Sequence, residues 1–166
     1  MSVFQKLINY FKSLVVKLLG LHDSPTSLAG GVAIGIFVGF TPLFGLKTLI
    51  CLGLAYVLRC NPIAAVIAVT LHDVCAPIWP VILEMEYAIG IWILKMFHMA
   101  PAVTEMREFH IRDFMKWTTF LGIGLPLLIG SLFLSAPSAA ITYLLVYPVF
   151  KKRLERRAAM VEADSP

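Results

Sequence analysis

Five ionisable side chains lie within or close to apolar segments of the chain: Lys47, His72, Asp73, Glu84 and Glu86. Charged groups in such segments are costly, so they usually face protein or a water-filled cavity and mark the path of a substrate or proton. A lysine there could attract a phosphate, while imidazole and carboxyl groups could take up and release protons. These five residues are therefore candidates for substrate or proton handling.

Each candidate also has a purely structural interpretation. Lys47 could extend its ammonium from a hairpin turn to the membrane surface, and His72 and Asp73 could cap a turn. Glu84 and Glu86 are two residues apart and would point to largely different faces of a helix, so they form no obvious acid–base pair. At least one of the two glutamates is expected to face the interior, toward Lys47 or His72.

The composition indicates that membrane helices carry these residues. Hydrophobic residues make up 59% of the 166 residues and charged residues 14%, whereas a soluble domain carries roughly 25% charge. That much apolar surface does not fit inside one soluble core of this size. We expect an all-α integral membrane protein.

Residues 1–20 have the pattern of an amphipathic helix. Apolar residues fall on one half of a helical wheel and Lys6, Lys12 and Lys17 on the other, as in helices that lie in the membrane interface beside anionic headgroups. Ser24 and Pro25 then form a helix-start signal, with serine as the N-cap and proline in the first turn.

Residues 24–97 are expected to form a membrane core of two broken helical hairpins. In the first hairpin, 13-residue apolar runs at 28–40 and 48–60 flank a break, and each run gives about 20 Å of helix, short of the ~30 Å hydrocarbon core. In the second, a short run at 63–71 is broken before residues 77–97, which are long enough to cross. The residues that form the two broken tips are Thr41, Pro42, Gly45, Thr48, Pro77 and Pro80.

This pattern is typical of re-entrant hairpins, in which irregular backbone within the membrane is covered by protein. A single kinked span that runs through Pro42 is the alternative for the first hairpin.

The remaining segments are a polar surface helix at 98–116, a transmembrane hairpin at 117–150 that turns at 135–138, and a basic cytoplasmic tail at 151–166. If each hairpin returns to the side it left, 13 of the 14 Lys and Arg residues share one side, with Lys47 as the exception. The positive-inside rule makes that side the cytoplasm. The chain is thus predicted to be a multi-pass protein of the bacterial inner membrane with both termini cytoplasmic; in an alternative topology, residues 98–116 lie outside.

Gly31, Gly35 and Gly39 recur at every fourth position. Such a ridge of small residues lets another helix approach backbone to backbone. We expect the three glycines to pack against a helix or hairpin arm.

The residues around the first tip resemble a known family. The matching elements are Ser24-Pro25, then Ala33-x-Gly35-x-Phe37-x-Gly39-Phe40-x-Pro42-Leu43-Phe44-Gly45-Leu46-x-Thr48, then Asn61. Over about residues 20–100 the chain is similar to the bacterial membrane family catalogued as domain of unknown function 2062. At the second tip the chain has His72-Asp73-Val74-Cys75 where family members often have an Asn-Pro-Leu-Thr-like element. Some proteins that resemble this family are joined to glycosyltransferase domains, and the resemblance therefore implies a setting near lipid-linked envelope synthesis.

Several enzyme classes are excluded by motif. The sequence contains no phosphate-binding P-loop, no dinucleotide-binding glycine motif, no zinc-protease H-E-x-x-H and no G-x-S-x-G nucleophile elbow. We expect no metal and no cofactor. The basic run at 151–157 follows an apolar helix, a position that favours anionic lipid over nucleic acid as its partner.

Three function classes follow. The first is a transporter or flippase for an anionic lipid or lipid phosphate, in which the two broken tips meet within the bilayer, Lys47 attracts the phosphate, and His72, Asp73 and Glu84 take part in proton coupling or gating. The second is a non-catalytic adaptor for an envelope-synthesis glycosyltransferase or for its own oligomer. The third is an intramembrane enzyme using Asp73 or Glu84, although a lone carboxylate specifies no reaction. The first is preferred, with no enzyme activity.

Overall fold

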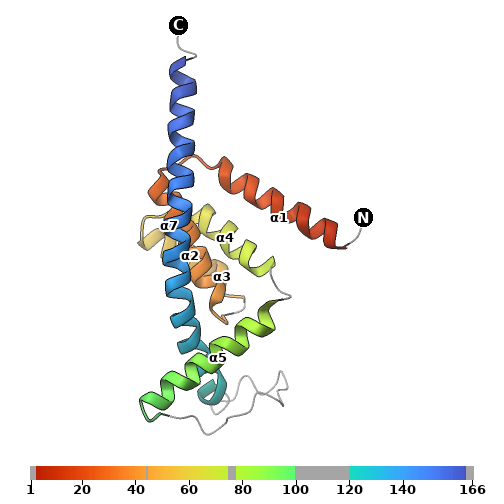
Figure 1. Cartoon of the computed structure of the whole chain (residues 1–166), viewed down its shortest axis with the longest axis vertical. Helices are drawn as coiled ribbons and strands as arrows, with labels where there is room; N and C mark the ends of the chain where they lie inside the picture. Colours follow the sequence, from red (N-terminus) through yellow and green to blue (C-terminus); the bar gives the residue numbers. More distant parts are fainter. Residues whose placement is uncertain (1–2, 44, 75–77, 100–119, 164–166) are drawn as a thin grey trace.

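The computed structural model describes residues 3–43, 45–74, 78–99 and 120–163, and every element within these ranges is helical. The predicted all-α class is confirmed. The elements are α1 (Val3–Gly20), α2 (Pro25–Phe40), α3 (Lys47–Val57), α4 (Pro62–Val74), α5 (Trp79–Met96), a short π-helix, η3 (Phe120–Gly124), and α7 (Leu125–Ala163). The long α7 forms the axis along which the other helices pack (Figure 1).

Among the described side chains of α1, those in its C-terminal half pack on the rest of the chain. Leu14 and Leu18 are buried in a cluster that includes Phe150 of α7, while α1 slopes away from α7 toward its N-terminal end (Figure 1). Earlier apolar residues of the helix are exposed, among them Tyr10 and Phe11. The N-terminal half of α1 therefore presents an uncovered apolar face.

α2 begins and ends at the predicted signals. Ser24 is its N-cap and accepts a hydrogen bond from the Ser27 backbone N–H, with Pro25 in the first turn. At the other end the Thr41 hydroxyl donates to the Val38 carbonyl at 2.7 Å, one residue before Pro42. The chain then turns at Gly45, whose φ of 86° is readily adopted only by glycine.

α3 returns alongside α2, and α4 then runs parallel to α2. The start of α4 is fixed by Asn61, whose side-chain oxygen accepts from the Ala64 N–H at 2.9 Å and whose backbone N–H donates to the Ser27 carbonyl at 3.0 Å. Because α3 runs back along α2 and α4 runs in the same direction as α2, the C-terminal ends of α2 and α4 lie at the same end of the core.

The three glycines of α2 lie in its contact with α4. A Cβ on Gly31 or Gly35 would overlap the Asn61 or Ala65 carbonyl, and a Cβ on Gly39 would overlap the His72 side chain. The absence of side chains on α2 therefore allows the two helices to approach backbone to backbone.

Gly35→Ala is expected to lower the free energy of unfolding by about 1–3 kcal/mol, because the new methyl group would meet the backbone and Ala68 of α4. Gly53→Ala on α3 is the matched control, since nothing lies within 4 Å of its added Cβ and alanine favours the helix. Thermal unfolding in detergent measures both. Equal stabilities of the two variants would contradict the close contact.

A polar clamp joins the α1–α2 connection to the start of α4. The Asp23 carboxylate accepts hydrogen bonds from the Ser24 N–H at 2.7 Å, the Ser27 hydroxyl at 2.8 Å and the Asn61 amide at 3.0 Å. The bonds from Asn61 and then Ser27 lower the pKa of Asp23 below its ordinary value of 3.8. Because the folded-state pKa is the lower one, this stabilisation is present above pH 3.8 and is lost as the pH falls through the folded-state pKa.

Asp23→Ala should therefore destabilise the protein at neutral pH by about 1 kcal/mol, a typical net value for hydrogen bonds of this kind. The difference from wild type should shrink as the pH is lowered below 3.8. Unfolding curves recorded as a function of pH test this, with the exposed Glu155→Ala as the control. A difference that is constant with pH would mean that the carboxylate charge is not involved.

α4 and α5 form a sharply bent pair. Their axes differ by 101°, and α5 crosses α7 near its start (Figure 1). At the crossing a Cβ on Gly90 would overlap the Pro126 carbonyl, and one on Gly130 would overlap the Glu86 carbonyl. The two glycines thus allow close contact between α5 and α7.

The predicted C-terminal hairpin is wrong. α7 is one continuous helix from Leu125 to Ala163, and Pro137 and Pro148 lie inside it, so the predicted turn at 135–138 does not form and the basic residues continue the helix. The Ser135 and Ser138 hydroxyls donate to the Leu132 and Leu134 carbonyls. A proline leaves a helix carbonyl without its donor, and serines next to it can bond backbone carbonyls without ending the helix.

One described helix, which comprises η3 from Gly122 onward and α7 as far as Met160, is long and apolar enough to cross a membrane. The bent pair α4 and α5 meets the same criteria if the two helices are taken as one broken span, while α2 and α3 are shorter apolar helices. The predicted surface helix at 98–116 lies outside the described residues except for positions 98 and 99, which follow the end of α5.

Candidate functional site

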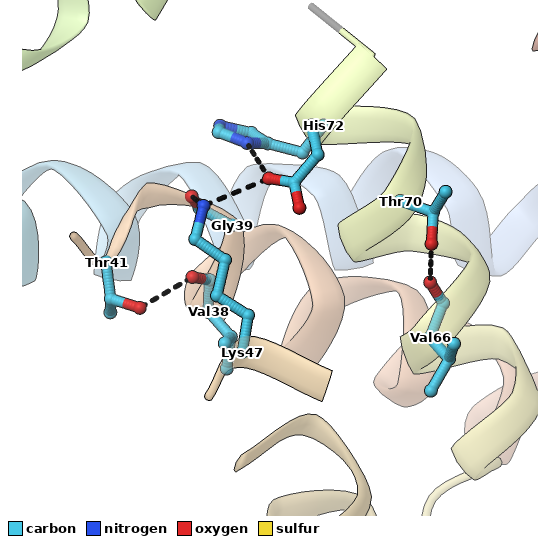
Figure 2. Close-up of polar contacts among 8 residues, drawn as sticks. Val38, Gly39, Thr41, Lys47, Val66, Thr70 and His72 are labelled. Atoms are coloured by element: carbon cyan, nitrogen blue, oxygen red, sulfur yellow. Dashed lines mark hydrogen bonds and ion pairs between the residues drawn. The ribbon is translucent and has the colours of Figure 1, made fainter. Parts of the chain in front are cut away.

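Lys47 is the centre of a cluster formed where the broken helices meet. It is the first residue of α3 and is only 6% exposed. Its ammonium donates to the Gly39 carbonyl of α2 at 2.7 Å and to the Asp73 carboxylate of α4 at 3.0 Å. In Figure 2 the Lys47 side chain reaches across to Gly39 and to the helix that carries His72. The cation therefore links three separate helices.

The two partners of the ion pair differ in exposure. The Lys47 side chain is 8% exposed and that of Asp73 is 38% exposed. Burying an unpaired ammonium is costly, so Asp73 and the Gly39 carbonyl stabilise a charge that has little contact with solvent.

His72 lies beside the ion pair without a close bond to it. Its Nδ1 is 3.8 Å from the nearer Asp73 oxygen, which is too long for a hydrogen bond, and its ring packs against Phe40 with centroids 4.8 Å apart. Within the described residues the buried Nδ1 has no hydrogen-bond partner.

α5 contributes an aromatic ring and a carboxyl group. The Lys47 ammonium lies 4.8 Å from the centre of the Trp79 ring, within the range of a cation–π interaction. Glu86 is fully buried, at 0% exposure, and neither carboxyl oxygen has a hydrogen-bond partner in the described part of the chain. Both residues line the same small cavity as Lys47 and His72.

The cavity has a volume of about 20 Å³, enough for about one water molecule, which needs roughly 10–15 Å³. Helix ends of both polarities surround it. The first turns of α3 and α5 begin at Lys47 and Trp79 without a side-chain cap, and the last turn of α2 supplies the Gly39 carbonyl. Uncapped N-terminal N–H groups favour an anion and terminal carbonyls favour a cation.

The predicted candidates divide into two groups. Lys47, His72, Glu86, Thr41 and Pro42 line the cavity, and Asp73 pairs with Lys47. The others lie elsewhere: Glu84, Thr48 and Pro80 are exposed, Gly45 forms the turn, and Pro77 is outside the described residues. Within the described ranges, no His, Cys, Asp or Glu residues form a group that could hold a metal ion.

Several contacts in the structure are absent from the sequence prediction. Trp79 and the Gly39 carbonyl contact Lys47, and Gly90 and Gly130 form the α5–α7 crossing. The α5–α7 crossing could have been predicted in part, because Gly90 lies four residues after Glu86 on the same helical stripe. The hydrogen bond to the Gly39 carbonyl could not, because a backbone carbonyl is free to accept only where its helix ends.

Comparison with known proteins identifies the family. A family model described as "Uncharacterized protein conserved in bacteria (DUF2062)" matches residues 8–159. The chain belongs to this family. No curated protein and no solved structure matches the chain. The DUF2062 match includes every helix that contributes to the Lys47 cluster, and it extends the resemblance seen around the first tip to nearly the whole chain.

Proposed function

We propose that this DUF2062 protein is a small protein of the bacterial inner membrane that moves an anionic lipid, or a lipid-phosphate intermediate of envelope synthesis, between the leaflets. The observation that carries the proposal is the buried Lys47 ammonium, bonded to Gly39 and Asp73 where the ends of α2 and α4 meet the starts of α3 and α5. Broken helices that meet at a charged residue are typical of substrate sites in membrane transporters.

Helix lengths support a membrane placement with re-entrant hairpins. α2 begins beside Phe150, with which Leu28 shares a cluster, and its 16 residues extend about 24 Å. The 13 residues of α4 extend about 20 Å. Both helices stop short of a ~30 Å hydrocarbon core, so in this arrangement their tips lie within the membrane while α7 crosses it.

The charge distribution supports a cytoplasmic location for both ends of the chain. α1 packs beside Phe150 and carries three exposed lysines, close to the basic run that begins at Lys151. Because α7 is a single helix, Lys95 at the end of α5 lies toward the opposite face. This arrangement favours a topology in which the end of α5 and the start of α7 lie toward the outside.

The small cavity corresponds to a closed state in this proposal. A phosphate is larger than the space for one water, so it would enter by separating Lys47 from Asp73 and taking the place of the carboxylate beside the ammonium. Positive ends of α3 and α5 would add to its attraction. Glu86, buried without a hydrogen-bond partner among the described residues, would take up or release a proton as the site opens.

The adaptor function remains the second candidate, favoured by the outer face of α3. Leu49, Leu52 and Tyr56 are exposed there at one-turn spacing, and Gly53 has open space beside it. A transmembrane helix of an envelope glycosyltransferase, or of a second copy, would fit such a face.

Reconstitution distinguishes the two functions. Purified protein in liposomes that contain fluorescent phosphatidylglycerol should expose inner-leaflet lipid to an external quencher faster than protein-free liposomes do. Fluorescent phosphatidylcholine should move more slowly, because it lacks net negative charge. No acceleration for phosphatidylglycerol or for a lipid-linked phosphate, in samples with intact fold, would leave the adaptor as the better account.

A further inference from the structure

A groove lies at the start of α2, opposite the end that contacts Lys47, between the α1–α2 connection and the C-terminal part of α7. Its volume is about 960 Å³, at the upper end of the roughly 300–1,000 Å³ typical of ligand pockets. Leu28, Phe150 and Leu154 contribute to an apolar wall, and Arg153 and Arg157 line the same groove.

The two arginines present positive charge along one side of this apolar groove. They are four residues apart, so they share a face of α7. Within the described residues neither forms an ion pair, and the buried Arg153 Nε has no hydrogen-bond partner. Asp23 also lines the groove, but its carboxylate already accepts bonds from Ser24, Ser27 and Asn61.

We propose that this groove binds a phosphate-bearing anionic lipid, with the headgroup phosphate on Arg153 and Arg157 and an acyl chain along Leu28, Phe150 and Leu154. Guanidinium groups bind phosphate through paired, charge-assisted hydrogen bonds, and the apolar wall excludes water from a chain. His22 also lines the groove and would add a further polar contact to the headgroup. The site is separate from the Lys47 cluster and does not depend on lipid movement.

Native mass spectrometry of the full chain, titrated with dioleoylphosphatidylglycerol and dioleoylphosphatidylcholine, tests the site. Arg153→Gln/Arg157→Gln should weaken phosphatidylglycerol binding about tenfold or more, the loss expected for charge-assisted bonds. The matched control, Lys152→Gln/Arg156→Gln, removes the same charge from exposed positions outside the groove lining and should change binding less than about twofold. Ala158→Trp fills the groove without changing its charge and should also weaken phosphatidylglycerol binding. This variant tests the site independently if the arginine double variant does not fold.

Other outcomes would overturn the proposal. Equal losses in the two double variants would mean that the basic helix attracts lipid without a defined site. If phosphatidylcholine bound as tightly as phosphatidylglycerol, the negative charge of the headgroup would not contribute to binding. If inorganic phosphate fully displaced the lipid, the arginines would form a site for free phosphate. If the protein formed a dimer that Ala158→Trp abolished, the groove would be occupied by a second copy of the chain. Lys47→Met should leave binding in the groove unchanged, so failure here is distinguishable from failure of the proposed lipid movement.

Discussion

Lys47→Met is expected to reduce lipid movement in proteoliposomes to the rate of protein-free vesicles. The variant keeps an unbranched apolar side chain but removes the ammonium that bonds Gly39 and Asp73. Without the buried cation, an anion has no charged partner at the meeting point of the helices. The remaining Asp73 is 38% exposed and therefore less buried than Lys47, so the loss of stability should be smaller than for loss of the carboxylate, about 1–2 kcal/mol.

Asp73→Ala is expected to have the larger effect on stability. It leaves the Lys47 cation, with 8% of its side chain exposed, without its carboxylate, and breaking a buried ion pair in this way typically costs about 3–5 kcal/mol. Removing both charges with Lys47→Met/Asp73→Leu should recover most of that stability, because no unpaired charge remains. Lipid movement should not recover.

Thermal unfolding in detergent and the lipid assay separate these effects, with Lys95→Met as the control for loss of an exposed lysine. The double variant decides between a structural and a functional ion pair. If it moves lipid as fast as wild type, Lys47 and Asp73 serve only to hold the helices together.

Glu86→Gln is expected to slow lipid movement by about tenfold or more, a factor that corresponds to about 1.4 kcal/mol of lost coupling. The amide keeps the size of the carboxyl group but cannot ionise, so it cannot release a proton or take one up at physiological pH. Stability should be unchanged or higher, since Glu86 is fully buried without a hydrogen-bond partner in the described residues. The rate of lipid movement, measured over a range of pH, should vary less with pH in Glu86→Gln than in the wild type.

Glu84→Gln provides the comparison on the same helix. Glu84 is exposed and lies outside the cavity lining, so its replacement should leave both rate and stability close to wild type. Equal loss of activity in the two variants would indicate that overall charge on α5, rather than the buried carboxyl group, controls movement.

Local signals predict the core of the fold well. Ser24 and Pro25 define the start of α2, and the break between α2 and α3 contains Pro42 and Gly45. The prolines and Gly45 determine backbone geometry through their own covalent structure, and Ser24 caps α2 through a local hydrogen bond, so none of them depends on distant contacts. The spacing of Gly35 with its neighbours likewise matches a close helix contact, although the partner, α4, could not be identified from spacing alone.

Features that depend on tertiary contacts could not be predicted in the same way. Ser135 and Pro137 have the composition of a turn, yet α7 continues through both as a single helix. The sequence alone does not decide which of Glu84 and Glu86 is buried, and the crossing of α5 on α7 buries Glu86. The pairing of Lys47 with Asp73 joins residues 26 positions apart and depends on the parallel arrangement of α2 and α4.

Cysteine labelling at Leu49 tests most directly whether the first broken tip lies in the membrane. Leu49 is 66% exposed on the outer face of α3, so water would make a cysteine there reactive and lipid would protect it. In sealed vesicles, with Cys51, Cys60 and Cys75 replaced by alanine, Leu49→Cys should resist a membrane-impermeant maleimide from both faces, while Lys152→Cys should react from one. Rapid reaction of Leu49→Cys from either face, at the rate of Lys152→Cys, would contradict the account.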